Sequence, residues 1–219
     1  MFLGHFGLAF AAKKAAPQVS LGTLILAAEL LDVIWPVLVL GGVETVAVAP
    51  GITRVTPLDF TSYPWSHSLA MAIVWGAAMA AIYWVVRRNV ANALWLGALV
   101  VSHWVLDWIV HRPDLPLYPG DPSRHGLGIW NDMPTTFVLE LGLFGAGIYL
   151  FLRASRARDR TGAIAFWALV ITLLAAYAGA VFGPPPPSPQ VVAASGLVGY
   201  LMVAWGWWID RHREPRDAR

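Results

Sequence analysis

Residues 92–111 read NALWLGALVVSHWVLDWIVH, an apolar run in which only His103, Asp107 and the terminal His111 are ionisable. A helix of about 20 residues, rising about 1.5 Å per residue, crosses the roughly 30 Å hydrocarbon core of a bilayer. The stretch therefore predicts a membrane-spanning helix with ionisable side chains inside it. Such side chains cost about 2.5–3.5 kcal/mol each at the bilayer centre, and for this reason they usually mark a functional site.

The composition of the whole chain is that of a membrane protein. Of its 219 residues, 58% are hydrophobic and 13% are charged, whereas soluble domains have about 45–50% and about 25%. A soluble enzyme and a disordered chain are thereby excluded. The chain has no cysteine, which excludes disulfides, iron–sulfur clusters, thiolate zinc sites and cysteine nucleophiles.

Six apolar stretches are long enough to cross a bilayer. We predict an all-α integral membrane protein, a six-helix transmembrane bundle that forms a single polytopic domain over residues 1–219. A short N-terminal half-helix is expected in residues 1–12, which are apolar but too few to span. The expected spans are residues 19–41, 66–86, 92–111, 133–153, 162–182 and 190–210.

Twelve of the fifteen basic residues gather in four short clusters. With six spans the clusters fall on one side of the membrane, and an excess of Lys and Arg marks the cytoplasmic side. We predict a bacterial-type inner (plasma) membrane protein with both termini cytoplasmic. The net charge is only +2 and the arginines are not interleaved with aromatic residues, so no nucleic-acid partner is expected. The clusters are Lys13–Lys14, Arg87–Arg88, Arg153–Arg160 and Arg211–Arg219.

Ionisable residues of different spans fall at one depth. Counted from the cytoplasmic end at about 1.5 Å per residue, Asp32, His103, Asp107 and Glu140 lie at about 16–22 Å. They therefore share a layer in the outer half of the membrane. A lone buried histidine or glutamate is more often a packed or hydrogen-bonded residue than a ligand, but a shared layer indicates a polar functional centre.

The spacing of these residues favours a divalent metal. His103 and Asp107 are four residues apart, so a nitrogen and an oxygen ligand project from one helix face. His67 opens the second span at its outer end, and a half-helix ending at Lys13 lifts His5 about 12 Å into the membrane. Ligands without sulfur suit zinc, which we favour, as well as manganese or iron. The predicted ligands are His5, Asp32, His67, His103 and Asp107.

Two further acids and two further histidines have other expected roles. Glu29, three residues before Asp32, or Glu140 would act as a general base or hold a ligand histidine in its tautomer. His111 and His125 fall at or beyond a membrane edge, where a solvated histidine is the ordinary case.

Short motifs in residues 1–120 resemble those of the YdjM-type family of inner-membrane proteins, which are regarded as metal-dependent hydrolases. Gly4-His5, followed by Gly7, is similar to the family's N-terminal histidine motif. Ser66-His67-Ser68-Leu69 resembles its Thr-His-Ser-Leu motif, and His103-Trp104-Val105-Leu106-Asp107 its His-x-x-Leu-Asp motif. Leu30-Leu31-Asp32 stands where the family usually has Pro-Asp-x-Asp, so one aspartate is absent unless Glu29 replaces it.

Three functions are open from the sequence. The first is a membrane-embedded metal-dependent hydrolase acting on a lipid-like or phosphoester substrate near the outer headgroups. The second is a proton- or cation-coupled transporter, in which the buried acids form a relay. The third is a noncatalytic subunit or assembly factor of a larger membrane complex, whose Gly-rich last span would suit helix contacts. Membrane lipids are the expected surroundings in each case, and a homo-oligomer is also open.

Overall fold

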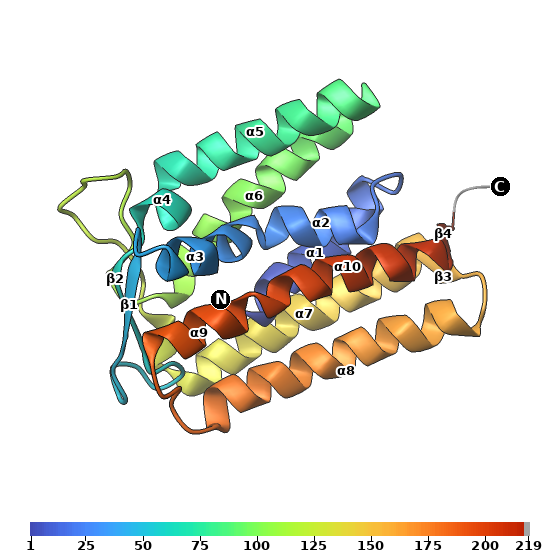
Figure 1. Ribbon diagram of the computed structural model, residues 1–219. Coiled ribbons are helices and arrows are strands. Elements are labelled where there is room, and N and C mark those ends of the chain that lie inside the picture. Colours follow the sequence, from blue (N-terminus) through green and yellow to red (C-terminus); the bar gives the residue numbers. More distant parts are fainter. Residues whose placement is uncertain (217–219) are drawn as a thin grey trace.

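The computed structural model describes residues 1–216, so Arg219 of the last basic cluster lies outside the described residues. It confirms an all-α membrane protein (Figure 1). Five helical segments are long and apolar enough to cross a bilayer. They are α5 (Leu69–Arg87), α6 (Val90–Val110), α7 (Met133–Ala154), α8 (Arg160–Phe182) and the pair α9–α10 (Pro189–Gly196 and Val198–Arg211).

The first predicted span, residues 19–41, is not one straight helix. It consists of α2 (Leu21–Ala28) and α3 (Leu30–Leu40), which meet at Glu29 at an angle of 58°. The last carbonyl groups of a helix have no partner within that helix. Here the Ala28 carbonyl accepts a hydrogen bond from His103 Nδ1 at 2.7 Å, so a side chain of α6 replaces a partner lost at the break.

The second predicted span, residues 66–86, begins later than expected. His67 ends a separate short helix, α4 (Pro64–His67), and the backbone at Ser68 is extended, with φ −80° and ψ 151°. The Ser68 hydroxyl caps α5 by accepting from the Met71 amide at 3.3 Å. The prediction that His67 begins the second span was therefore wrong, because His67 lies on α4 and the span begins at Leu69. The separate helix allows the His67 side chain to point into the bundle.

The predicted half-helix is α1 (Leu3–Ala15). It lies inside the bundle and packs against α7, α2 and α6 (Figure 1). Glycines permit the closest approach, because a Cβ atom added to Gly147 on α7 would lie 2.1 Å from the Gly7 carbonyl oxygen on α1. The first residues of α1 are buried, so their backbone amides need hydrogen-bond partners inside the protein.

The two ends of the bundle differ (Figure 1). One end carries the four basic clusters and a short antiparallel pair, β3 (Ser155–Ala157) with β4 (Arg213–Pro215). The clusters thus gather as predicted, and the assignment of this end to the cytoplasm stays a prediction. Loops cover the other end, with the antiparallel pair β1 (Thr45–Val48) and β2 (Leu58–Ser62) and the 3₁₀ turn Ile129–Asn131.

Candidate metal centre

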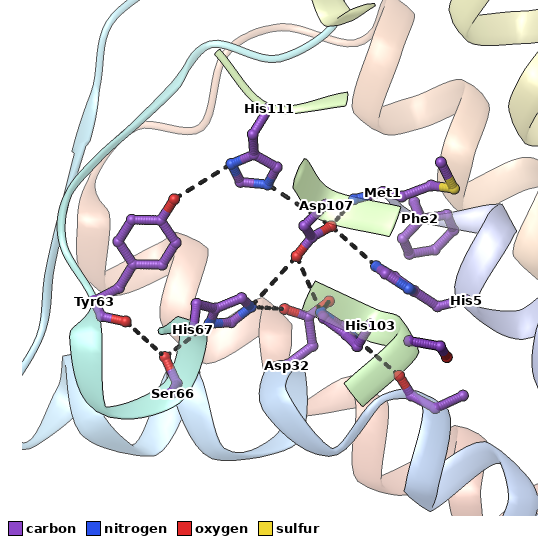
Figure 2. A network of polar contacts seen from close by, with 12 residues as sticks. Met1, Phe2, His5, Asp32, Tyr63, Ser66, His67, His103, Asp107 and His111 are labelled. Carbon is purple, nitrogen blue, oxygen red and sulfur yellow. Dashed lines mark hydrogen bonds and ion pairs between the residues drawn. The ribbon is translucent and has the colours of Figure 1, made fainter. Parts of the chain in front are cut away.

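Four histidines surround the buried carboxylate of Asp107, beneath the loop-covered end (Figure 2). Oδ1 lies 3.1 Å from His5 Nε2 and 3.8 Å from His111 Nε2. Oδ2 lies 3.2 Å from His103 Nε2 and 3.8 Å from His67 Nε2. The histidines come from α1, α4, α6 and the residue after α6, so tertiary structure assembles the group.

A second carboxylate, that of Asp32 on α3, completes one side of the cluster. Its Oδ1 lies 3.2 Å from His67 Nε2, and its Oδ2 lies 3.8 Å from His103 Nε2. The Asp32 side chain is 43% exposed, whereas that of Asp107 is 3% exposed. Asp32 therefore faces open space, and Asp107 forms the buried floor.

Hydrogen bonds fix the orientation of His103. Its Nδ1 must donate, because the Ala28 group that it contacts is a carbonyl. In a neutral imidazole the other nitrogen then carries a lone pair. That nitrogen, Nε2, forms no hydrogen bond within residues 1–216, although the Asp107 and Asp32 oxygens face it. Nitrogen and oxygen acceptors that face one another in a buried site need a proton or a metal ion between them.

His67 is oriented in the same way by a longer chain of hydrogen bonds. The Ser66 hydroxyl donates to Glu44 Oε2 at 2.6 Å, so His67 Nδ1, 2.7 Å from that hydroxyl, is the donor to it. Glu44 is fixed in turn by the amides of Trp65 and Ser66, each at 2.8 Å. The His67 Nε2 lone pair consequently points at the two aspartates. A hydrogen-bond partner at the other ring nitrogen is typical of metal-ligating histidines.

Asp114 performs this role for His111. Its Oδ1 lies 3.0 Å from His111 Nδ1 and accepts from the Tyr63 hydroxyl at 2.6 Å. Burial and the neighbouring Asp114 charge raise the pKa of Tyr63 well above its ordinary value, so the hydroxyl keeps the proton that it donates. His111 thus also presents Nε2 toward Asp107.

The spacing of the ligand atoms fits a divalent ion. Four nitrogen or oxygen ligands at about 2.0–2.2 Å from zinc lie about 3.3–3.6 Å from one another in a tetrahedral site. The four nitrogen–oxygen distances among His67, His103, Asp32 and Asp107 are 3.2–3.8 Å. Two groups of three residues have ligand atoms within 4.8 Å of one another: His67 with His103 and Asp107, and His5 with Asp32 and His103. The His5 ring stacks on that of His103 at 3.6 Å. These distances support a metal centre without identifying the metal.

The two glutamates predicted to take part in the chemistry have different surroundings. The Glu140 carboxylate accepts from the amides of Phe2, at 3.0 and 3.2 Å, and of Gly4, at 2.9 Å. It thereby supplies buried partners for the start of α1 and positions His5. Glu29, at the α2–α3 break, is buried, and its Oε1 has no hydrogen-bond partner among the described residues.

A partly open cavity of about 550 Å³ adjoins the cluster. Its walls come mainly from apolar side chains of α1, α3, α8, α9 and α10, among them Phe6, Leu173 and Met202. Glu29, Asp32 and Asp107 form part of its polar side. Ligand sites are usually concave and mostly apolar, with a few convergent polar groups, and this cavity has that character.

The structure brings the five predicted ligands together with His111, which the sequence placed at a membrane edge. His111 follows Asp107 by four residues, and this helical spacing could have predicted that the two side chains share one face. His125 stays outside the cluster, 2.9 Å from the Ser123 hydroxyl. The sequence reasoning missed the residues whose hydrogen bonds orient His67 and His111, which are Tyr63, Ser66, Glu44 and Asp114. Glu44 and Asp114 lie in loops, where no periodicity predicts contact.

A comparison with protein families confirms the resemblance noted from the motifs. The model described as YdjM inner membrane protein matches residues 3–183, which include all four histidines and both aspartates of the cluster. No curated protein and no solved structure matches the chain.

Proposed function

The chain belongs to the YdjM inner membrane protein family, and we propose that it is a membrane-embedded metal-dependent hydrolase. The proposal rests on one observation above all. The Nε2 atoms of His67 and His103, with their tautomers fixed by hydrogen bonds at Nδ1, face the oxygens of Asp32 and Asp107. We assign these four residues as ligands of a divalent ion, with zinc favoured, and place His5 beside them.

The chemistry expected of such an ion is Lewis acidity, which activates water near neutral pH and stabilises charge on a phosphoryl or carbonyl oxygen. The protein's own residues would orient the ligands of the ion and transfer protons to and from the reacting groups. Glu29 Oε1 faces this region without a hydrogen-bond partner in residues 1–216, so we assign it as the general base that takes a proton from water. Glu140, occupied by two backbone amides, is assigned a positioning role.

The apolar cavity favours a lipid-like substrate, such as a phospholipid or another phosphoester with an acyl chain. Its apolar walls would accommodate the chain, and its polar side would place the ester near Asp32 and Glu29. The predicted depth of the cluster, in the outer half of the membrane, leads to the same substrate class.

Elemental mass spectrometry of detergent-purified protein tests the metal. We expect at least one divalent ion per wild-type chain and its loss in His103→Ala. His212→Ala is the matched control, because this histidine pairs with Asp159 at the basic end. Lipid products are then measured after incubation with phosphatidylethanolamine and phosphatidylglycerol vesicles. Hydrolysis that is lost in Glu29→Gln, while the metal is retained, would support the enzyme.

A wild-type chain that binds no metal would overturn the proposal. The buried acids would then belong to a proton path or to an interface with another membrane protein. Proton-dependent uptake into vesicles would support the transporter, and copurification in a stoichiometric complex would support the subunit.

A further inference from the structure

We propose that Trp35 and Tyr177 donate hydrogen bonds to the ester carbonyl oxygens of a diacyl lipid, which binds in the cavity beside the cluster. Both residues line this cavity of about 550 Å³. The inference rests on the proposed function and names the chemistry of its substrate, which is an ester-linked lipid and not an isoprenoid or ether-linked phosphoester.

Two buried donors in the cavity wall have no partner within the protein. Trp35 and Tyr177 are only 7% and 6% exposed. Neither Trp35 Nε1 nor the Tyr177 hydroxyl forms a hydrogen bond within residues 1–216. A buried indole N–H or phenol O–H usually finds a partner, and leaving one unpaired is costly. An occupant of the cavity that carries acceptor atoms would supply the missing partners.

Both rings lie next to the ionisable residues. Trp35 follows Asp32 by three residues on α3, so the two side chains share one face of that helix. Tyr177, on α8, stacks on the Phe2 ring at 6.2 Å, and the Phe2 amide donates to Glu140 Oε1 at 3.0 Å. The two donors therefore stand on different walls of the cavity at its polar side, where the polar end of a bound lipid would lie.

The chemistry of these donors favours a neutral acceptor. An indole N–H donates and cannot accept, and in the described part of the chain no Lys or Arg lines the cavity to bind an anion there. An ester carbonyl is an uncharged acceptor attached to an apolar chain. A diacyl lipid has two such carbonyls between its chains and its headgroup, whereas an isoprenoid or alkyl ether chain has none.

The cavity is accessible from the side of the bundle. Ala176 and Ala180 of α8, Ser195 of α9 and Val198 of α10 line it and are exposed. They belong to two segments that are long and apolar enough to cross a bilayer. The exposed surface of such a segment faces lipid, so a membrane lipid can reach the cavity between α8 and α9–α10 without passing through water.

Two lipids that differ only in their carbonyls test the inference. The probes are diacyl phosphatidylglycerol and its dialkyl ether analogue, with equal chain lengths. Native mass spectrometry of the detergent-purified wild-type chain measures the affinity for each and reports the mass of the bound lipid, so intact lipid is counted whether or not it is hydrolysed. Because the headgroup is the same, the ratio of the two affinities reports the carbonyls. We expect the wild type to bind the diacyl lipid more tightly.

Conservative variants assign this preference to the two donors. Tyr177→Phe keeps the ring that stacks on Phe2 and removes only the hydroxyl. It should lower the ratio about 2- to 10-fold, the net effect of one hydrogen bond, and Trp35→Phe should do the same. Tyr149→Phe and Trp95→Phe are matched controls, because both side chains are exposed and lie outside the cavity. They should leave the ratio unchanged.

The outcomes separate this inference from the proposed function. Equal affinities for the two lipids in the wild type, or a preference that Tyr177→Phe and Trp35→Phe both keep, would overturn the carbonyl site and leave the hydrolase intact. A preference lost in both variants would support the site. The same loss in a chain that binds no metal would overturn the hydrolase and leave a lipid-binding site.

Discussion

Opposite charges meet at the surface at the basic end of the bundle, whereas imidazoles and carboxylates meet inside the fold at the other end. Arg156 Nη2 and Arg158 Nε contact the Glu214 carboxylate at 2.5 and 3.4 Å, with all three side chains at least 30% exposed. His212 Nδ1 pairs with Asp159 at 2.7 Å, also in contact with solvent. Each of these groups finds its partner within the protein or in water.

The buried cluster is different because several of its nitrogen atoms face carboxylate oxygens away from solvent. Three histidines use Nδ1 in hydrogen bonds and direct the other nitrogen at carboxylate oxygens. Surface ion pairs contribute about 0–1 kcal/mol each, but an unpaired charge or acceptor inside a fold costs much more. Residues of the same types therefore act as surface pairs at one end and form a buried group at the other, which could hold a metal ion. Four variants test this contrast.

The largest effect is expected from Asp107→Asn, which keeps the side chain's size and removes the charge at the centre of the cluster. All four histidines face this carboxylate, so the variant should lose all bound metal, as measured by elemental mass spectrometry. Asp210→Asn is the control at the basic end, where Asp210 Oδ1 contacts Lys13 Nζ at 2.9 Å. If Asp107→Asn bound as much metal as the wild type, the buried cluster would not differ from the basic end as a metal site.

Ser66→Ala should have the next largest effect, because it interrupts the path from Glu44 to His67 without removing a ligand. Loss of a residue that hydrogen-bonds to a ligand histidine typically lowers metal affinity about 10- to 100-fold. Competition against a chelator of known affinity measures the change. Ser102→Ala is the matched control, since the Ser102 hydroxyl bonds only to the Leu99 carbonyl of its own helix. Equal affinities in the two variants would argue against a supporting role for Ser66.

Gly147→Ala tests the helix that joins the two ends, because α1 carries both His5 and Lys13. A Cβ atom at residue 147 would lie 2.1 Å from the Gly7 carbonyl oxygen, and such overpacking costs about 1–3 kcal/mol. We expect a lower thermal unfolding temperature together with weaker metal binding. Gly145→Ala, two residues away with nothing within 4 Å of the added atom, should change neither quantity; a comparable loss there would refute the packing argument.

The smallest effect is expected at the basic end, from Asp159→Asn. The hydrogen bond with His212, and then that from the Gly162 amide, lower the pKa of Asp159 below its ordinary 3.8. Its contribution to stability is therefore present above the ordinary pKa and is lost as the pH falls through the lower folded value. The variant should unfold at a slightly lower temperature than wild type at pH 7, and the difference should shrink as the pH falls below 3.8. A difference that stayed constant at acid pH would argue against the ionised Asp159 carboxylate as its cause.

The sequence alone was sufficient for the all-α membrane class and the short N-terminal helix, whereas the bend at Glu29 and the separate helix α4 were not predicted. The common membrane depth of the acids and histidines stays a prediction. Apolar length and the spacing of charged residues are local properties, and helical geometry converts them directly into depth and into shared faces. The spacings of three residues between Glu29 and Asp32, and of four between His103 and Asp107, are local properties of this kind. The metal that they predict stays a prediction.

Only the tertiary structure decided which of these residues meet and what holds them. The bend at Glu29 frees the Ala28 carbonyl for His103, the separate helix α4 turns His67 inward, and Ser66 and Asp114 fix two of the histidines. These contacts join residues up to 75 positions apart and depend on loop paths that no hydrophobic period encodes. The sequence thus identified the ionisable residues that lie in apolar segments, and packing determined that their imidazole nitrogens and carboxylate oxygens face one another.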